Sequence, residues 1–127
     1  MSTTSDLERI GQIAINVKSL ERAVAFYRDT LGMKFLFEAP GLAFFDCGGV
    51  RLMLGPAEKP EFDHPGSILY YKVADIGATH RRLSDRGVVF EAEPHLVARL
   101  PEHDLHLAFF RDTEGNLLAL MGEVARA

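Results

Sequence analysis

The tetrapeptide LAFF occurs twice in this chain, and each copy is followed by a glycine-containing turn and a second apolar run. The first copy opens "LAFFDCGGVRLMLG" (42–55) and the second opens "LAFFRDTEGNLLALMG" (107–122). Two apolar runs separated by a glycine turn predict a β-hairpin, because glycine readily adopts the positive-φ conformations that such turns need. The repeated hairpin therefore predicts two copies of one structural unit.

The residues before the first hairpin predict a strand, a helix and another strand. The alternating segment "IGQIAINV" (10–17) is typical of a half-buried strand. Ser19 is placed to cap a helix that Gly32 ends, since serine accepts from the first-turn amides and glycine tolerates the left-handed C-terminal conformation. The segment "KFLFEA" (34–39) is a second strand. The first half is thus predicted to be βαβββ.

The same order returns after the proline-rich segment "PAEKPEFDHP" (56–65), which favours a linker. The segment "SILYYKV" (67–73) predicts a strand, Asp75 caps the following helix, and Gly87 ends it. We predict a strand for "VVFEA" (88–92) and attribute the extra length of the second half to the segment before the second LAFF.

These observations predict an α+β fold made of two βαβββ modules. We expect one domain over residues 1–127, with module one at about 8–55, a linker at about 56–66 and module two at about 67–122.

Composition excludes several function classes. The net charge is −4 without a Lys/Arg cluster, which argues against a nucleic-acid surface, and no apolar run approaches the length of a membrane span. The polar start "MSTTSDLERI" lacks the layout of a secretory signal, and Cys47 is the only cysteine. We therefore expect a cytoplasmic protein that binds neither nucleic acid nor membrane.

Two longer segments, "IAINVKSLERAVAFYRDTLGMKF" and "FFRDTEGNLLAL", resemble the vicinal oxygen chelate superfamily, the glyoxalase / bleomycin-resistance / extradiol dioxygenase group. The resemblance covers roughly residues 8–122. It implies two modules that form a cupped mixed β-sheet with helices outside, a cavity enclosed by that sheet, and a homodimer. In metal-dependent members, four inward positions carry His, Glu or Gln and hold a divalent ion that polarises substrate oxygens.

Transferred to this chain, the four family positions fall on Gln12, Leu52 or Met53, Ile68 and Ala119. One neutral amide cannot replace the several oxygen or imidazole donors that such an ion needs, so the resemblance predicts no metal and no cofactor here. The segment "PEHDLH" (101–106) contains His103 and His106 at His-x-x-His spacing, but alternation turns His106 away from the face of Leu107.

Alternation from the aligned positions predicts a largely apolar cavity lining with a few polar groups. Arg51 enters the cavity in one register and faces away in the other, and both registers stay open. The predicted ligand-binding residues are Gln12, Ala14, Asn16, Phe44, Arg51, Met53, Ile68, Tyr70, Leu107, Phe109, Ala119 and Met121.

The leading hypothesis from the sequence is a metal-free, homodimeric binding protein for a small apolar or aromatic molecule. The alternative is an enzyme: a lyase, isomerase or dioxygenase with an atypical metal site, or metal-free acid–base chemistry through Tyr70 or a nearby carboxylate. A third possibility is an interaction module with a filled cavity. No catalytic residue is assigned.

Overall fold

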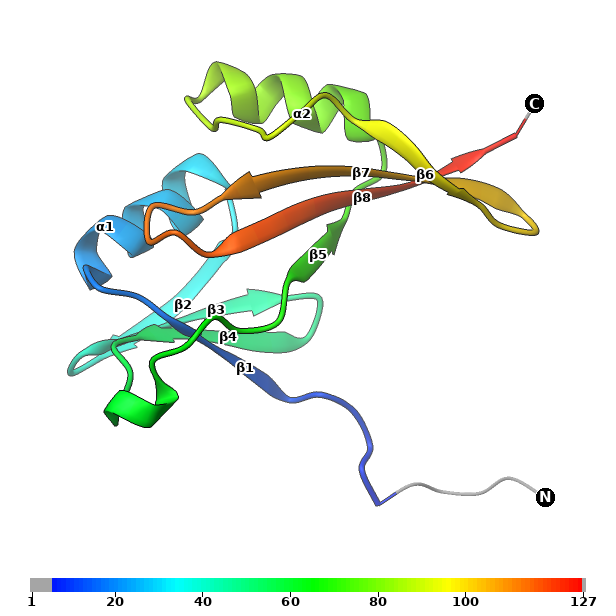
Figure 1. Cartoon of the computed structure of the whole chain (residues 1–127). Coiled ribbons are helices and arrows are strands. Elements are labelled where there is room, and N and C mark those ends of the chain that lie inside the picture. The colour runs from blue at the N-terminus through cyan, green and yellow to red at the C-terminus, as the bar shows by residue number, and fades with distance from the viewer. Residues whose placement is uncertain (1–5, 127) are drawn as a thin grey trace. The chain divides into compact units, whose positions relative to one another are not determined.

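Each half of the chain forms a four-stranded mixed sheet with a helix packed on it (Figure 1). The computed structural model describes residues 6–126. The chain divides into two compact units between His64 and Pro65, inside the segment that was expected to be a linker. The α+β class and the repeated strand order are confirmed.

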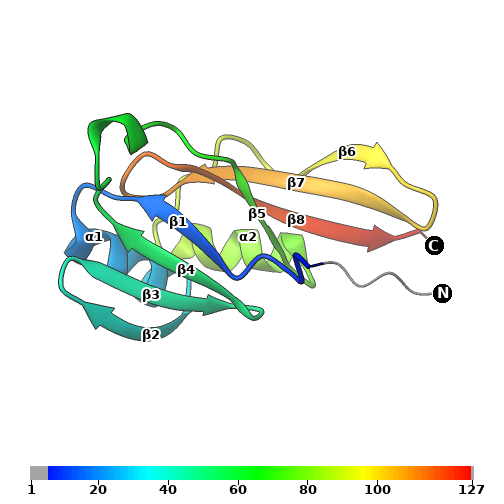
Figure 2. The same cartoon turned by 90° about the horizontal axis from the view of Figure 1, so that it is seen from below.

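Unit 1 contains the first module. Its strands are β1 (Gln12–Asn16), β2 (Lys34–Ala39), β3 (Leu42–Cys47) and β4 (Val50–Gly55). Its helix α1 (Leu20–Ala25) continues into a wider π-helical turn, η1 (Phe26–Thr30). The sheet order is β1-β4-β3-β2, with β1 parallel to β4 and the other pairs antiparallel, as Figure 2 shows.

Unit 2 repeats this arrangement. Its strands are β5 (Leu69–Lys72), β6 (His95–Arg99), β7 (His103–Arg111) and β8 (Leu117–Ala125), and its helix is α2 (Ile76–Asp85). The order is β5-β8-β7-β6, again with the first and last strands parallel. Between the last strand of unit 1 and the first strand of unit 2, the short 3-10 helix η2 (Pro60–Phe62) begins at a proline.

The predicted helix boundaries have the expected chemistry. The Ser19 hydroxyl accepts from the backbone N–H of Arg22 at 3.3 Å, and the Asp75 carboxylate accepts from that of Ala78 at 3.0 Å. Gly32 and Gly87, the predicted helix ends, have φ values of 74° and 95°.

The strand predicted at 88–92 is wrong. Phe90 makes only an isolated bridge to Phe110, and the strand of unit 2 that corresponds to β2 is β6. The reason is the length of β7, which begins at His103 and so offers its backbone to residues beyond Pro94. The segment interpreted as extra length therefore contains β6.

One face of each sheet packs against its helix. In unit 1, Tyr27 lies against Phe45, with ring centroids 6.0 Å apart, and Phe45 also meets Phe35 edge to face at 5.4 Å. In unit 2, Ile76 of α2 packs directly on Gly122, where an added Cβ would lie 2.9 Å from the Cβ of Ile76. Glycine thus allows α2 to approach β8 closely.

The β7–β8 turn is fixed by a buried carboxylate. Asp112 is 6% exposed and accepts from the backbone N–H groups of Glu114 and Asn116, each at 2.8 Å. It also accepts from the Asn116 side-chain amide at 2.9 Å. Gly115, with φ of 86°, completes the turn.

Within residues 6–126, no helix combines the length and the apolar character that crossing a lipid bilayer requires.

We expect Asp112→Ala to lower the free energy of unfolding by about 1–3 kcal/mol, because it leaves partly buried donors without an acceptor. Thr113→Ala, in the same turn but exposed, should change it by less than about 0.5 kcal/mol. Urea denaturation followed by circular dichroism measures both. Equal effects of the two substitutions would contradict this role of Asp112.

Candidate functional site

Six predicted lining residues lie on one face of the unit 1 sheet, which we call the Gln12 face. The strand register places Gln12 beside Arg51, Ala14 beside Met53, and Met53 beside Phe44. Asn16 follows on the same side of β1. The alternate residues, including Leu52 at 2% exposure, belong to the face that is buried with α1. The predicted residues on the Gln12 face are Gln12, Ala14, Asn16, Phe44, Arg51 and Met53.

The register of β4 decides two questions that the sequence leaves open: which face Arg51 lies on, and whether Leu52 or Met53 shares that face. Arg51 lies on the Gln12 face, and its Nε donates to Gln12 Oε1 at 2.7 Å. Its guanidinium carbon lies 5.2 Å from the centroid of the Phe44 ring, in cation–π range. Met53, and not Leu52, shares this face, and Gln12 Nε2 lies 3.7 Å from the Met53 sulfur.

Two further residues of the Gln12 face were not in the predicted set. A bulge in β2 between Phe35 and Phe37 moves Phe37 onto this face, where it stacks on Phe44 with centroids 4.6 Å apart. Asp46 lies opposite Arg51 in the β3–β4 register. Regular alternation would put Phe37 on the same face as Phe35, and nothing in the sequence predicts the bulge.

Asn16 has a structural partner. Its side-chain amide donates to the backbone carbonyl of Phe62 in η2 at 2.6 Å. Asn16, which was expected to bind a ligand, therefore holds the segment that follows β4 by a hydrogen bond.

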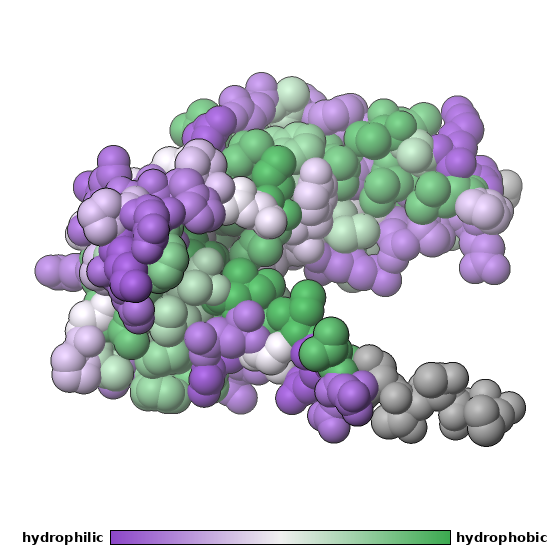
Figure 3. All heavy atoms as spheres, turned by 60° about the horizontal axis from the view of Figure 1, so that its bottom comes forward, coloured by the Kyte–Doolittle hydropathy of each residue, from purple (hydrophilic) through white to green (hydrophobic). Residues whose placement is uncertain are grey.

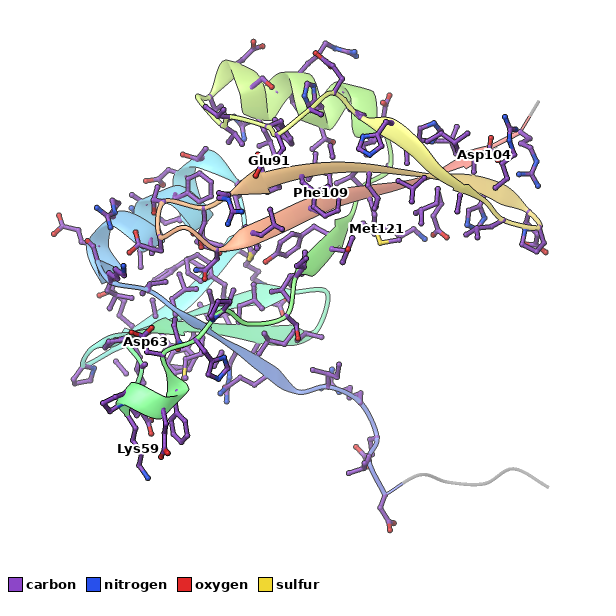
Figure 4. All side chains as sticks on the ribbon, in the orientation of Figure 1. Lys59, Asp63, Glu91, Asp104, Phe109 and Met121 are labelled. Atoms are coloured by element: carbon purple, nitrogen blue, oxygen red, sulfur yellow. The ribbon has the colours of Figure 1, made fainter. Side chains whose placement is uncertain are left out.

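The remaining predicted residues lie in unit 2, on the sheet face that we call the Tyr70 face. Tyr70 and Phe109 both flank Ala119 in the register, and Leu107 lies beside Met121. The Tyr70 and Phe109 rings meet edge to face at 6.0 Å. Figure 4 shows the side chains of Phe109 and Met121 on the side of the sheet away from α2. Ile68 immediately precedes β5 and is 38% exposed.

Exposed apolar surface accompanies these faces. Phe37 is 47% and Tyr70 is 45% exposed, whereas Ala119 and Leu107 are buried. Figure 3 shows exposed hydrophobic residues among hydrophilic ones on one side of the molecule. Aromatic and apolar groups mixed with a few polar ones are the composition that is typical of small-molecule binding sites.

An ionic cluster borders the Tyr70 face. Glu123 Oε1 lies 2.6 Å from Lys72 Nζ, and Glu123 Oε2 lies 2.5 Å from His103 Nε2. The hydrogen bond from Lys72 lowers the pKa of the Glu123 carboxyl, and the charge on His103 acts in the same direction. The sequence pointed to His103 but not to these partners. His106 pairs with Leu96 and Gly122 and lies on the opposite face, so the His-x-x-His spacing does not bring the two imidazoles together.

The family metal positions do not fit a divalent ion. They carry an amide, a thioether and two aliphatic side chains: Gln12, Met53, Ile68 and Ala119. The one amide oxygen already accepts from Arg51, whose own positive charge lies beside it. Within residues 6–126, no three His, Cys, Asp or Glu side chains are grouped as metal ligands are.

Comparison with known proteins gives one family. The model of the Glyoxalase/Bleomycin resistance protein/Dioxygenase superfamily matches residues 9–120, nearly the whole chain. A glyoxylase-like domain-containing protein from Didymella fabae is 32% identical over 126 residues, which cover 88% of this chain and 91% of that relative.

Two solved structures have the same fold. The antibiotic binding protein TnmS3 from Streptomyces sp. CB03234 has a TM-score of 0.75 and 24% identity, covering 94% of this chain and 99% of that one. Lactoylglutathione lyase from Agrobacterium tumefaciens has a TM-score of 0.72 and 23% identity, covering 93% and 96%. At such identity the likeness establishes the fold alone.

The Glu123 cluster predicts a pH-dependent contribution to stability. The carboxyl pKa is lowered in the folded state, so its contribution is complete above the ordinary glutamate pKa of 4.5 and is lost as the pH falls through the lower, folded-state value. The difference in Tm between the wild type and Glu123→Gln should therefore shrink as the pH is lowered from about 5 to about 3. Differential scanning calorimetry measures it, with exposed Glu21→Gln as the control. A difference that grows on acidification would contradict this sign.

Proposed function

Because this chain belongs to the Glyoxalase/Bleomycin resistance protein/Dioxygenase superfamily, we propose that it is a metal-free binding protein for a small, largely apolar or aromatic molecule. The observation that carries the proposal is the chemistry of the family metal positions. The Gln12 amide oxygen accepts a hydrogen bond from the Arg51 guanidinium, while Met53, Ile68 and Ala119 have no oxygen or imidazole nitrogen that could coordinate a divalent ion. A face that cannot polarise a substrate through a metal can still hold one by apolar contact.

The twelve predicted lining residues are the proposed ligand-contacting set, divided between the Gln12 face and the Tyr70 face. Phe37 joins the first of these as an exposed aromatic surface. The relationship in fold to a protein described as antibiotic-binding supports a role in which binding itself is the function.

We also propose that the protein is a cytoplasmic homodimer. The sole cysteine, Cys47, has a thiol whose pKa is raised by burial and by Asp46, which favours its protonated form. Each sheet ends in outer strands, β1 and β2 in unit 1 and β5 and β6 in unit 2, and outer strands can pair with a second copy.

A metal-free enzyme is the second candidate, and the His103–Glu123 pair favours it. Glu123 Oε2 lies 2.5 Å from His103 Nε2, and a carboxylate at this distance can orient an imidazole on the Tyr70 face for proton transfer. Conversion of a bound molecule that is lost in His103→Gln, while binding remains, would establish this candidate. Recovery of every bound molecule unchanged supports the binding protein.

We expect a thermal-shift screen to find stabilisation by some apolar or aromatic organic molecules. Such a ligand at about 100 times its Kd adds about 2.7 kcal/mol to the free energy of unfolding. Zn²⁺, Ni²⁺, Mn²⁺ and Fe²⁺ should give no stabilisation. One equivalent of tightly bound metal, found by elemental analysis of the protein as purified, would overturn the metal-free proposal.

Light scattering should give twice the chain mass of 14.1 kDa at micromolar concentration. A mass of one chain across the accessible concentration range would contradict the homodimer.

A further inference from the structure

We propose that the ligand carries an anionic group, such as a carboxylate, sulfonate or phosphate, that pairs with Arg51 on the Gln12 face. This inference rests on the proposed binding function and specifies the chemistry of its ligand. A planar apolar part of the ligand would stack on the rings of Phe37 and Phe44, and its anionic group would pair with the Arg51 guanidinium.

Arg51 is held in place before any ligand arrives. Its Nε is bonded to Gln12 Oε1 at 2.7 Å, and its guanidinium lies over Phe44. An exposed arginine on a strand normally moves freely and loses conformational entropy when it forms an ion pair. These two contacts reduce that loss, so Arg51 is better prepared to bind an anion than an unrestrained surface arginine.

The terminal nitrogens of the guanidinium are available. Within the described residues, Nε is the only Arg51 side-chain nitrogen in a hydrogen bond, and Arg51 is exposed. The two Nη groups present four further N–H donors in a planar fork that matches two oxygens of an oxyanion. This fork distinguishes the site from a general patch of positive charge.

The aromatic groups extend from this cation along the sheet. Phe37 stacks on Phe44 at 4.6 Å, so a pair of rings lies next to the guanidinium on one face. Phe37 is nearly half exposed and can accept a planar group by stacking. The combination selects an aromatic anion over either an aromatic neutral molecule or an inorganic anion.

Asp46 is the charged group that opposes this assignment. It lies opposite Arg51 across the β3–β4 pair, yet no ion pair joins these two described residues. The guanidinium bonds instead to Gln12. The carboxylate weakens the local positive potential without occupying the donors, so its removal should strengthen anion binding.

Two fluorescent probes with the same ring system test the proposal. 8-Anilinonaphthalene-1-sulfonate carries a sulfonate, and N-phenyl-1-naphthylamine lacks it. Arg51→Gln should weaken binding of the sulfonate about tenfold, equivalent to about 1.4 kcal/mol, and change binding of the neutral probe less than about twofold. Asp46→Asn should strengthen binding of the sulfonate about two- to threefold and leave the neutral probe unchanged.

The control is Arg82→Gln, which removes one positive charge from the exposed surface of α2 and should alter neither affinity. Melting temperatures of all three variants show that each is folded, and Arg51→Lys, which keeps the charge but not the fork, should be intermediate. If both probes bind and Arg51→Gln behaves like Arg82→Gln, the anion assignment is wrong while the binding function stands. If neither probe nor any other aromatic compound binds, the proposed function itself fails.

Discussion

Parallel pairing of the first and last strands in each unit is the constraint on which the rest of the structure depends. Parallel neighbours cannot be joined by a tight turn, so α1 must carry the chain from β1 back over the sheet before the hairpin brings β4 alongside. This pairing places Gln12 next to Arg51, which lies 39 residues away in sequence. In unit 2 it places Tyr70 next to Ala119. In each unit this pairing brings the first strand of the candidate face beside the last one.

The same pairing separates core from candidate site within each strand. In β4, Leu52 and Leu54 are buried, while Arg51 and Met53 lie on the other face. The buried side chains stabilise the unit because their apolar area is removed from water. The side chains that point to the opposite face contribute less to this term where they are exposed. Substitutions at the exposed positions of the Gln12 face, such as Gln12 and Arg51, should therefore cost little stability, whereas Phe44 on the same face is buried.

Electrostatics give the Gln12 face its character. A divalent ion needs several oxygen or imidazole donors, and the amide of Gln12 is instead satisfied by Arg51. The guanidinium supplies positive charge of its own beside Gln12, one of the positions that the resemblance assigns to a metal ligand. The chemistry changes accordingly, because a guanidinium pairs with an anion through hydrogen bonds but does not polarise an oxygen as a Lewis acid does.

Local chemistry was the part of the fold that the sequence could predict. Ser19 and Asp75 cap their helices, and Gly32 and Gly87 end them, because each effect acts within one turn of the chain. The strand expected at 88–92 was wrong for a reason outside its own residues. Pairing depends on how far the partner strand extends, and β7 extends far enough to pair with β6 instead.

The sequence by itself determined the repeated unit and its helix ends, because residue type and local pattern fix these. Only the tertiary structure decided the face of Arg51 and the position of Phe37. A strand has period two, so a shift of one residue moves a side chain to the opposite face, and alternation cannot choose the register. The pairing of β4 with β1 and β3 fixed Arg51, and the bulge in β2 carried Phe37 onto the stack with Phe44. These two placements together form the proposed anion site.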